Sequence, residues 1–270
     1  MGGYHGCDES GPLYPLGPDA VVSLVREGKL VAPMADEISA RSKGDMLSKG
    51  VALLQAFWFV VQCIARLIEH LPLTNLEVMT LAYTVVTVAM YLAWWDKPLN
   101  ISCAIRVPVA PHKGEPKDVY TWEWVLDYVI GYQDANASLH HLQRVPTFWA
   151  GDPDENDTIN ADIVALLVAM SFGAVHCIAW SYTFPSYTEL TMWQVSAIAI
   201  IAIPAGILLG LLPDTVDYVG VFLLLVLSFI GVPLYICARM VLLVLSFTTL
   251  KSLPYAVYHT VQWTELIPHI

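Results

Sequence analysis

The chain has 270 residues, of which 56% are hydrophobic and only 14% are charged. Soluble domains usually carry about 25% charged residues, so this composition is typical of a chain that lies largely in lipid. The net charge of −11 argues against nucleic acid as a partner, because phosphate binding needs a basic surface. The five cysteines have no metal-ligand spacing, and we expect reduced thiols, no metal site and no cofactor.

Residues 1–50 are polar and interrupted by glycine and proline, and we predict that they form a small N-terminal cap. Within them, GPDAVVSLVREGKL predicts a short helix that has Pro18 in its first turn and ends at Gly28. The segment is too short to hold a hydrophobic core of its own.

Residues 51–95 hold two apolar runs, each long enough to cross a bilayer as a helix. We predict the first membrane span over 51–68 and the second over 76–95. The second ends in Trp94 and Trp95, which suit the headgroup layer.

Residues 96–160 are predicted to form a long hydrophilic loop. Within it, DVYTWEWVLDYVIGY spaces its apolar residues as an amphipathic helix does, either on the membrane surface or packed on the soluble side.

Residues 161–250 hold the remaining spans, which we predict over 163–182, over 192–212 and within a last apolar stretch, 218–250. That stretch would be about 50 Å long as a helix, against a bilayer of about 30 Å. It is either one helix bent at Pro233, which we favour, or two short segments. Residues 251–270 then form an interfacial tail. The predicted fold class is an all-α polytopic membrane helix bundle with five spans.

Positive charge predicts an orientation. Residues 1–50 and residues 96–160 each hold five Lys or Arg residues, and two spans separate them. Both regions therefore fall on one side, which the positive-inside bias makes cytoplasmic. Sequons at Asn100, Asn136 and Asn156 point the other way. We give the charges more weight, because a sequon is only a three-residue pattern.

Polar residues form one stripe on each of the first two spans. The first stripe contains Gln55, Gln62, Arg66 and Glu69, and the second contains Glu77, Thr80, Thr84, Thr87 and Tyr91. Polar groups in lipid must face protein or water, so we expect the stripes to face each other and Arg66 to pair with Glu77. The stripes either line a polar cavity or fix helix packing, and we favour packing.

Two further polar residues lie inside later apolar runs. His176 could be a proton relay, a haem ligand or a satisfied donor. Arg239 is the most costly residue in the chain if it lies deep in lipid, and it needs a carboxylate, a carbonyl or water. Asp217, Glu77 and a lipid phosphate are candidates. We favour a structural ion pair over an anchor for a phosphate-bearing ligand.

Several motifs resemble a large family of uncharacterised multi-span membrane proteins found in fungi. They are SKGDMLSKG, WFVVQCIAR, LPLTNLE, WWDKPL and the ending IPHI. The resemblance implies a multi-span architecture and no particular activity. Related chains are often longer, which implies missing upstream spans as possible partners. They also often carry glutamate where this chain has Leu245.

Two functions remain open. The first is a non-enzymatic role, as a transporter or channel component or as a scaffold, with the lipid bilayer and other membrane proteins as partners. The second is a membrane-embedded enzyme acting on a lipid or isoprenoid. Its candidate catalytic residues are Glu77 and His176, and its candidate substrate-binding residues are Arg66, Arg239 and Gln62. Neither GxSxG, a P-loop, HExxH nor a DDxxD-like motif occurs.

Overall fold

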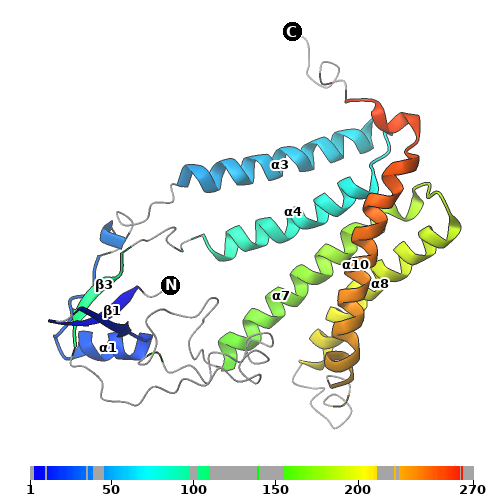
Figure 1. Cartoon of the computed structure of the whole chain (residues 1–270). Coiled ribbons are helices and arrows are strands. Elements are labelled where there is room, and N and C mark those ends of the chain that lie inside the picture. Colours follow the sequence, from blue (N-terminus) through cyan, green and yellow to red (C-terminus); the bar gives the residue numbers. More distant parts are fainter. Residues whose placement is uncertain are drawn as a thin grey trace. The chain divides into compact units, whose positions relative to one another are not determined.

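The computed structural model describes residues 3–9, 11–34, 36–38, 46–95, 97, 103–109, 139, 155–211, 222, 225–261 and 263. The chain divides into two compact units (Figure 1). The first, which we call the sheet unit, contains Met1–Asp45 and Lys97–Glu155, and the second, the helix bundle, contains Met46–Asp96 and Asn156–Ile270. The amphipathic helix predicted over 118–132, two of the sequons and Asp217 lie outside the described residues.

The sheet unit contains three short strands in the order β2-β1-β3. β1 (Tyr4–Asp8) pairs antiparallel with β2 (Gly11–Pro15) and parallel with β3 (Ile105–Pro108). The turn between β1 and β2 is closed by the Gly11 N–H, which donates to Asp8 Oδ1 at 3.0 Å. The all-α expectation was therefore wrong for this unit. Its strands are too short and too rich in glycine and proline to give a strand signal.

The sheet joins two regions that the sequence kept apart. The N-terminal segment has few apolar residues to bury, and β3 adds the fully buried Val107 to a small core with Tyr14 and Leu16. α1 (Pro18–Arg26) packs its apolar side on this core, and Gly28 follows it with φ +70°. The predicted short helix is thus confirmed. Because β1 and β3 share hydrogen bonds, these two strands lie on one side of any membrane that the helices cross.

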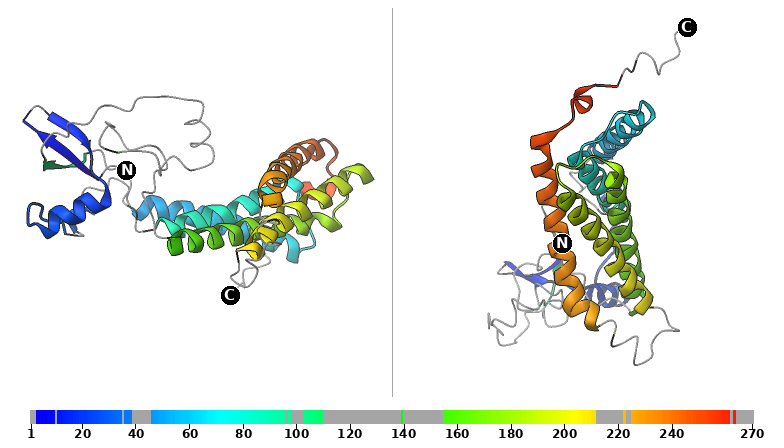
Figure 2. Two further views of the ribbon diagram at one scale, coloured as in Figure 1. Left: turned by 90° about the horizontal axis from the view of Figure 1, so that it is seen from below. Right: turned by 90° about the vertical axis from the view of Figure 1, so that its right-hand side faces the viewer.

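The helix bundle contains the predicted spans. Its long helices are α3 (Met46–Ile68), α4 (Asn75–Ala93), α7 (Glu155–His176), α8 (Tyr187–Gly210) and α10 (Val232–Thr248). The 3-10 turn η2 (Cys177–Ser181) extends α7, and η5 (Thr249–Ser252) extends α10. Within the described part of the chain, five helices are long and apolar enough to cross a membrane. α3 and α4 run side by side, and α10 packs along α8 (Figure 1 and Figure 2).

The last apolar stretch is one helical run from residue 225 to Ser252. A single π turn, η4 (Leu227–Gly231), lies directly before Pro233. Proline has no N–H to bond the preceding turn, and its ring crowds that turn, so a π turn is a natural way to accommodate it. In the described residues this agrees with one helix rather than two short segments.

The core and the surface of the bundle are both apolar. Trp193, Phe172, Ile200 and Leu242 are almost completely buried. The outer faces carry large exposed apolar side chains, among them Leu54, Phe57, Val195, Met240 and Phe229. Water would not tolerate so much contiguous apolar surface on a monomer, whereas lipid tails would cover it.

Two glycines in the bundle are predicted to respond oppositely to alanine. A Cβ on Gly173 of α7 would lie 2.6 Å from Ile201 Cγ1 and 3.3 Å from the backbone of Ile200, whereas one on Gly50 of α3 would meet nothing within 4 Å. We expect Gly173→Ala to lower the free energy of unfolding in detergent micelles by about 1–3 kcal/mol. Gly50→Ala should raise it by up to about 1 kcal/mol, through helix propensity. Effects of the same sign would contradict this packing of α7 on α8.

Candidate functional site

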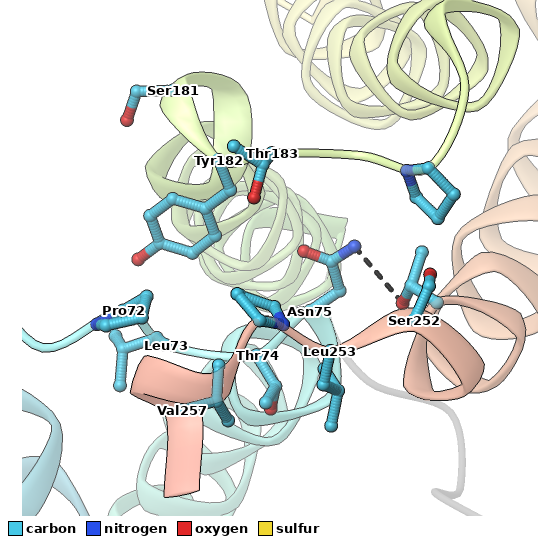
Figure 3. Close-up of a pocket in the computed structure, with 13 residues that line it drawn as sticks. Pro72, Leu73, Thr74, Asn75, Ser181, Tyr182, Thr183, Ser252, Leu253 and Val257 are labelled. Atoms are coloured by element: carbon cyan, nitrogen blue, oxygen red, sulfur yellow. Dashed lines mark hydrogen bonds between the residues drawn. The ribbon is translucent and has the colours of Figure 1, made fainter. Parts of the chain in front are cut away.

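Three chain segments meet at one end of the bundle. They are the α3–α4 turn, the α7–α8 turn and the chain after α10, and together they line a cavity of about 190 Å³. In Figure 3, Tyr182 and Thr183 face the Pro72–Asn75 segment, and Asn75 Nδ2 donates to Thr249 Oγ1 at 3.3 Å. This arrangement is the one expected if the five apolar helices of the described residues all cross a membrane, because the chain after the fifth would then leave on the side of both turns.

Arg66 fastens the tail to the helical hairpin. Its Nη2 donates to the Pro72 carbonyl and to the Val257 carbonyl, both at 3.0 Å, and its Nη1 donates to the His259 carbonyl at 3.4 Å. The predicted ion pair with Glu77 does not form, so that expectation was wrong. Arg66 instead donates to backbone carbonyls that have no other partner in the described part of the chain. They lie where α3 ends and where the tail crosses α3. Arg66 Nε is buried without a hydrogen-bond partner.

Glu77 is engaged in a helix cap. Its Oε2 accepts from the Thr74 N–H at 2.7 Å and from the Thr74 hydroxyl at 3.1 Å, while the Glu77 N–H donates to Thr74 Oγ1 at 3.0 Å. This capping box satisfies the first free N–H groups of α4. The signal, a threonine followed three residues later by glutamate ahead of an apolar run, is present in the sequence but was overlooked.

The cap can be tested by a matched pair of threonines on α4. Thr74→Ala removes the cap and should lower the free energy of unfolding by about 1 kcal/mol. Thr80 is exposed, and its hydroxyl bonds only to the Leu76 carbonyl one turn back, at 2.8 Å. Thr80→Ala should therefore change the stability by less than about 0.5 kcal/mol. Equal losses in a chemical-unfolding assay would count against the capping role.

The threonine hydroxyls of the polar stripe predicted on the second span are satisfied within α4. The Thr80, Thr84 and Thr87 hydroxyls each donate to their own helix. The buried face of α4 instead contains Asn75, Val78, Met79 and Ala82. Hydroxyls that donate to carbonyls of their own helix need no acceptor on a neighbouring helix. The apolar side chains therefore decide which face of α4 is buried.

A second pocket, which we call the hairpin pocket, lies where the tail crosses α3. It has a volume of about 340 Å³ and brings together three predicted site residues, Gln62, Arg66 and Glu77. Its other lining residues are Phe59, Cys63, Thr260, Val261 and Trp263. The Trp263 ring stacks on Trp58 with centroids 5.0 Å apart. The pocket could hold a small polar group against both a cation and a carboxylate.

Tyr182 contributes a neutral donor close to this end of the bundle. Burial, and to a lesser degree the neighbouring Cys63 and Glu77, raises the pKa of the Tyr182 phenol. Its hydroxyl is buried without a hydrogen-bond partner in the described structure. The phenol therefore stays protonated at neutral pH and can donate to a water or a ligand.

The other two predicted site residues lie in a separate aromatic cluster. His176 is fully buried, and its Nδ1 bonds the Phe172 carbonyl at 2.8 Å, so this nitrogen carries the proton. Trp193 Nε1 donates to the His176 carbonyl at 3.0 Å. The Arg239 guanidinium lies over the Phe172 ring, with Cζ 4.1 Å from its centroid. His176 thus acts as a packed core residue, away from the hairpin pocket.

Among the described residues, no three His, Cys, Asp or Glu side chains are grouped as a metal ion would require. His176 has its ring packed between Phe172 and Trp193, with centroid distances of 4.9 and 5.6 Å. Its Nε2 is buried without a hydrogen-bond partner in the described structure.

Comparison with known proteins yields one match. Residues 7–113 are similar to a family of unknown function, DUF8562. This match covers the end of β1, all of β2, α1, the α3–α4 hairpin and β3, and it includes Gln62, Arg66 and Glu77. No curated protein and no solved structure shows a significant match.

Proposed function

We propose that the protein is a multi-pass integral membrane protein with a non-enzymatic role, as a scaffold in a membrane complex. The proposal rests on one observation, which is that Arg66 and Glu77 both make hydrogen bonds within the chain. Arg66 bonds three backbone carbonyls, and Glu77 caps α4. A catalytic acid/base and an anion anchor need hydrogen-bonding groups that are free to meet a substrate, whereas Arg66 Nη1 and Nη2 and Glu77 Oε2 already bond within the chain.

Packing inside the bundle supports a scaffold over a transporter. At the level of Gly173, the seam between α7, α8 and α10 is closely packed by Phe172, Trp193, Ile200 and Leu242, all of them almost fully buried. Nearer Pro204, the same helices line a mostly apolar cavity of about 570 Å³. A transport path needs polar or hydrated lining groups at mid-membrane depth. Close helix contact, as at Gly173, instead makes a rigid body that can present fixed outer faces to partners.

The scaffold role predicts the result of a comparison between a deletion strain and a Glu77→Gln strain. Lipid and isoprenoid profiles should be unchanged in both. Meanwhile the extracted protein should migrate in native gels in a complex larger than its own 29.8 kDa. A lipid class that accumulates in both strains, at normal protein levels, would overturn the proposal.

The hairpin pocket favours one alternative, a membrane-embedded enzyme acting on a lipid or isoprenoid. At about 340 Å³, with Gln62, Arg66 and Glu77 in its lining, the pocket is large enough for the polar end of an amphiphile. In that case Glu77 would leave its cap to act as the acid/base. The same profiling experiment distinguishes this alternative from the scaffold.

The proposed orientation places the sheet unit in the cytoplasm and the C-terminal tail on the opposite side. It rests on the five basic residues in each of residues 1–50 and 96–160. The three sequons of the loop should then remain unmodified. Glycosidase treatment should leave the mobility of the chain unchanged, and a downward shift would reverse the orientation.

A further inference from the structure

Arg239 lies at the middle of a membrane span. The span Phe229–Ser252 places it about 15 Å from one end and about 20 Å from the other, at 1.5 Å per residue. Its guanidinium is held over the Phe172 ring and lies 5.6 Å from the Tyr83 centroid and 5.7 Å from the Tyr235 centroid. α4, α7 and α10 therefore each supply one aromatic ring beside it. Held this way, the cation cannot also reach the headgroups of a bilayer about 30 Å thick.

These rings leave the hydrogen-bonding needs of Arg239 unmet. A guanidinium has five N–H donors and no acceptor, and cation–π contact replaces only part of its hydration. Among the described residues, neither a carboxylate nor a carbonyl accepts a hydrogen bond from Arg239. An arginine at mid-membrane costs at least about 2.5–3.5 kcal/mol unless it is paired. A compensating group must therefore come from elsewhere.

The described spans supply no carboxylate at the depth of Arg239. Their carboxylates lie near helix ends, at Glu77, Asp157, Asp162 and Glu189, so a second copy of the described bundle has none at the depth of Arg239. The surface beside Arg239 is open on α10, where Ile236 is 56% exposed and Met240 is 55% exposed. An apolar helix could cover these side chains and bring a carboxylate to the guanidinium.

We propose that Arg239 is the docking point for a transmembrane helix of a different membrane protein, one that carries an aspartate or glutamate near mid-span. An ion pair between Arg239 and the partner's carboxylate would fix how far the partner helix is shifted along α10. Ile236 and Met240, on either side of Arg239, would provide apolar contact. The proposal rests on the scaffold role and adds the chemistry of its partner. It also agrees with the engagement of Arg66 and Glu77 elsewhere, because they lie at the tail end of the bundle and are not available to Arg239.

The experiment places a photo-reactive amino acid at position 236 in the full chain, in membranes of cells that naturally make it. Position 195, which is 60% exposed on α8, serves as the control. We expect one protein adduct from position 236 whose cross-linked span contains Asp or Glu. Arg239→Leu should reduce its yield at least tenfold, and Arg239→Lys should retain most of it. Arg239→Asp combined with an arginine in place of the partner's acid should restore it.

The outcomes separate this proposal from the scaffold role. Removing an unpaired cation from lipid should not unfold the bundle, so Arg239→Leu is expected at normal levels and with unchanged thermal stability. An adduct that survives Arg239→Leu, or an adduct with a lipid or a second copy, overturns the docking point and leaves the scaffold role standing. No protein adduct from either position, with a monomeric extracted chain, overturns both.

Discussion

Replacing Trp193 by alanine is expected to lower the free energy of unfolding of the bundle by about 3–5 kcal/mol. Trp193 is fully buried among residues of α7 and α8, its indole N–H donates to the His176 carbonyl, and its ring packs against His176 and Phe184. Truncation leaves a cavity that this close packing cannot fill, and it frees a buried carbonyl. Unfolding followed by tryptophan fluorescence or circular dichroism in detergent micelles measures the loss.

Two control variants isolate the cause. Trp193→Phe keeps most of the volume and loses only the N–H donor, so it should cost about 1–3 kcal/mol. Val195→Ala shortens an exposed side chain on the same helix and should change stability by less than about 0.5 kcal/mol. A Trp193→Ala chain as stable as Val195→Ala would contradict the packing of α7 on α8.

Arg66→Ala is expected to release the C-terminal tail and to lower the free energy of unfolding by about 2–4 kcal/mol. The substitution leaves the Pro72, Val257 and His259 carbonyls without their donor, and hydrogen bonds to charged groups contribute about 1.5–3 kcal/mol each, though not additively. Hydrogen exchange should show lost protection in residues 253–261. Limited proteolysis should cleave there at least tenfold faster.

The matched control is another cation near the same end of the bundle. Lys251 is exposed at the end of η5, and Lys251→Ala should leave both exchange and proteolysis unchanged. Arg66→Lys should restore the behaviour only in part, because an ammonium cannot reproduce the geometry of the guanidinium toward several carbonyls. Wild-type protection of the tail in Arg66→Ala would show that the tail is held by other contacts.

The long helices could be predicted from the sequence because each contains a long, mostly apolar run. Their ends were harder to place. α8 begins at Tyr187 rather than near residue 192, because Ser186 accepts from the Thr188 N–H and opens the helix earlier. α7 begins at Glu155, since polar residues such as Asn156 and Asp157 continue a helix outside an apolar run.

The sequence indicates which residues belong to the site, but it does not indicate which groups they contact. Gln62, Arg66 and Glu77 were identified as polar residues in apolar surroundings, and the structure places all three around one pocket. The partners of Arg66 come from the tail, far away in the sequence, and no local pattern reveals such a contact. The β1–β3 pairing could not be predicted for the same reason, because it joins strands that are far apart in the sequence.

The proposed topology of five spans would place the sheet unit and the C-terminal tail on opposite sides of a bilayer. A membrane-impermeant thiol reagent tests it in sealed vesicles of one orientation, using chains whose other cysteines are alanine. One chain keeps Cys103 of the sheet unit, which is exposed, and the other carries Tyr255→Cys, at a tail position 81% exposed. We expect one of them to be labelled at once and the other only after detergent is added. Labelling of both in intact vesicles, or of neither, would contradict the account.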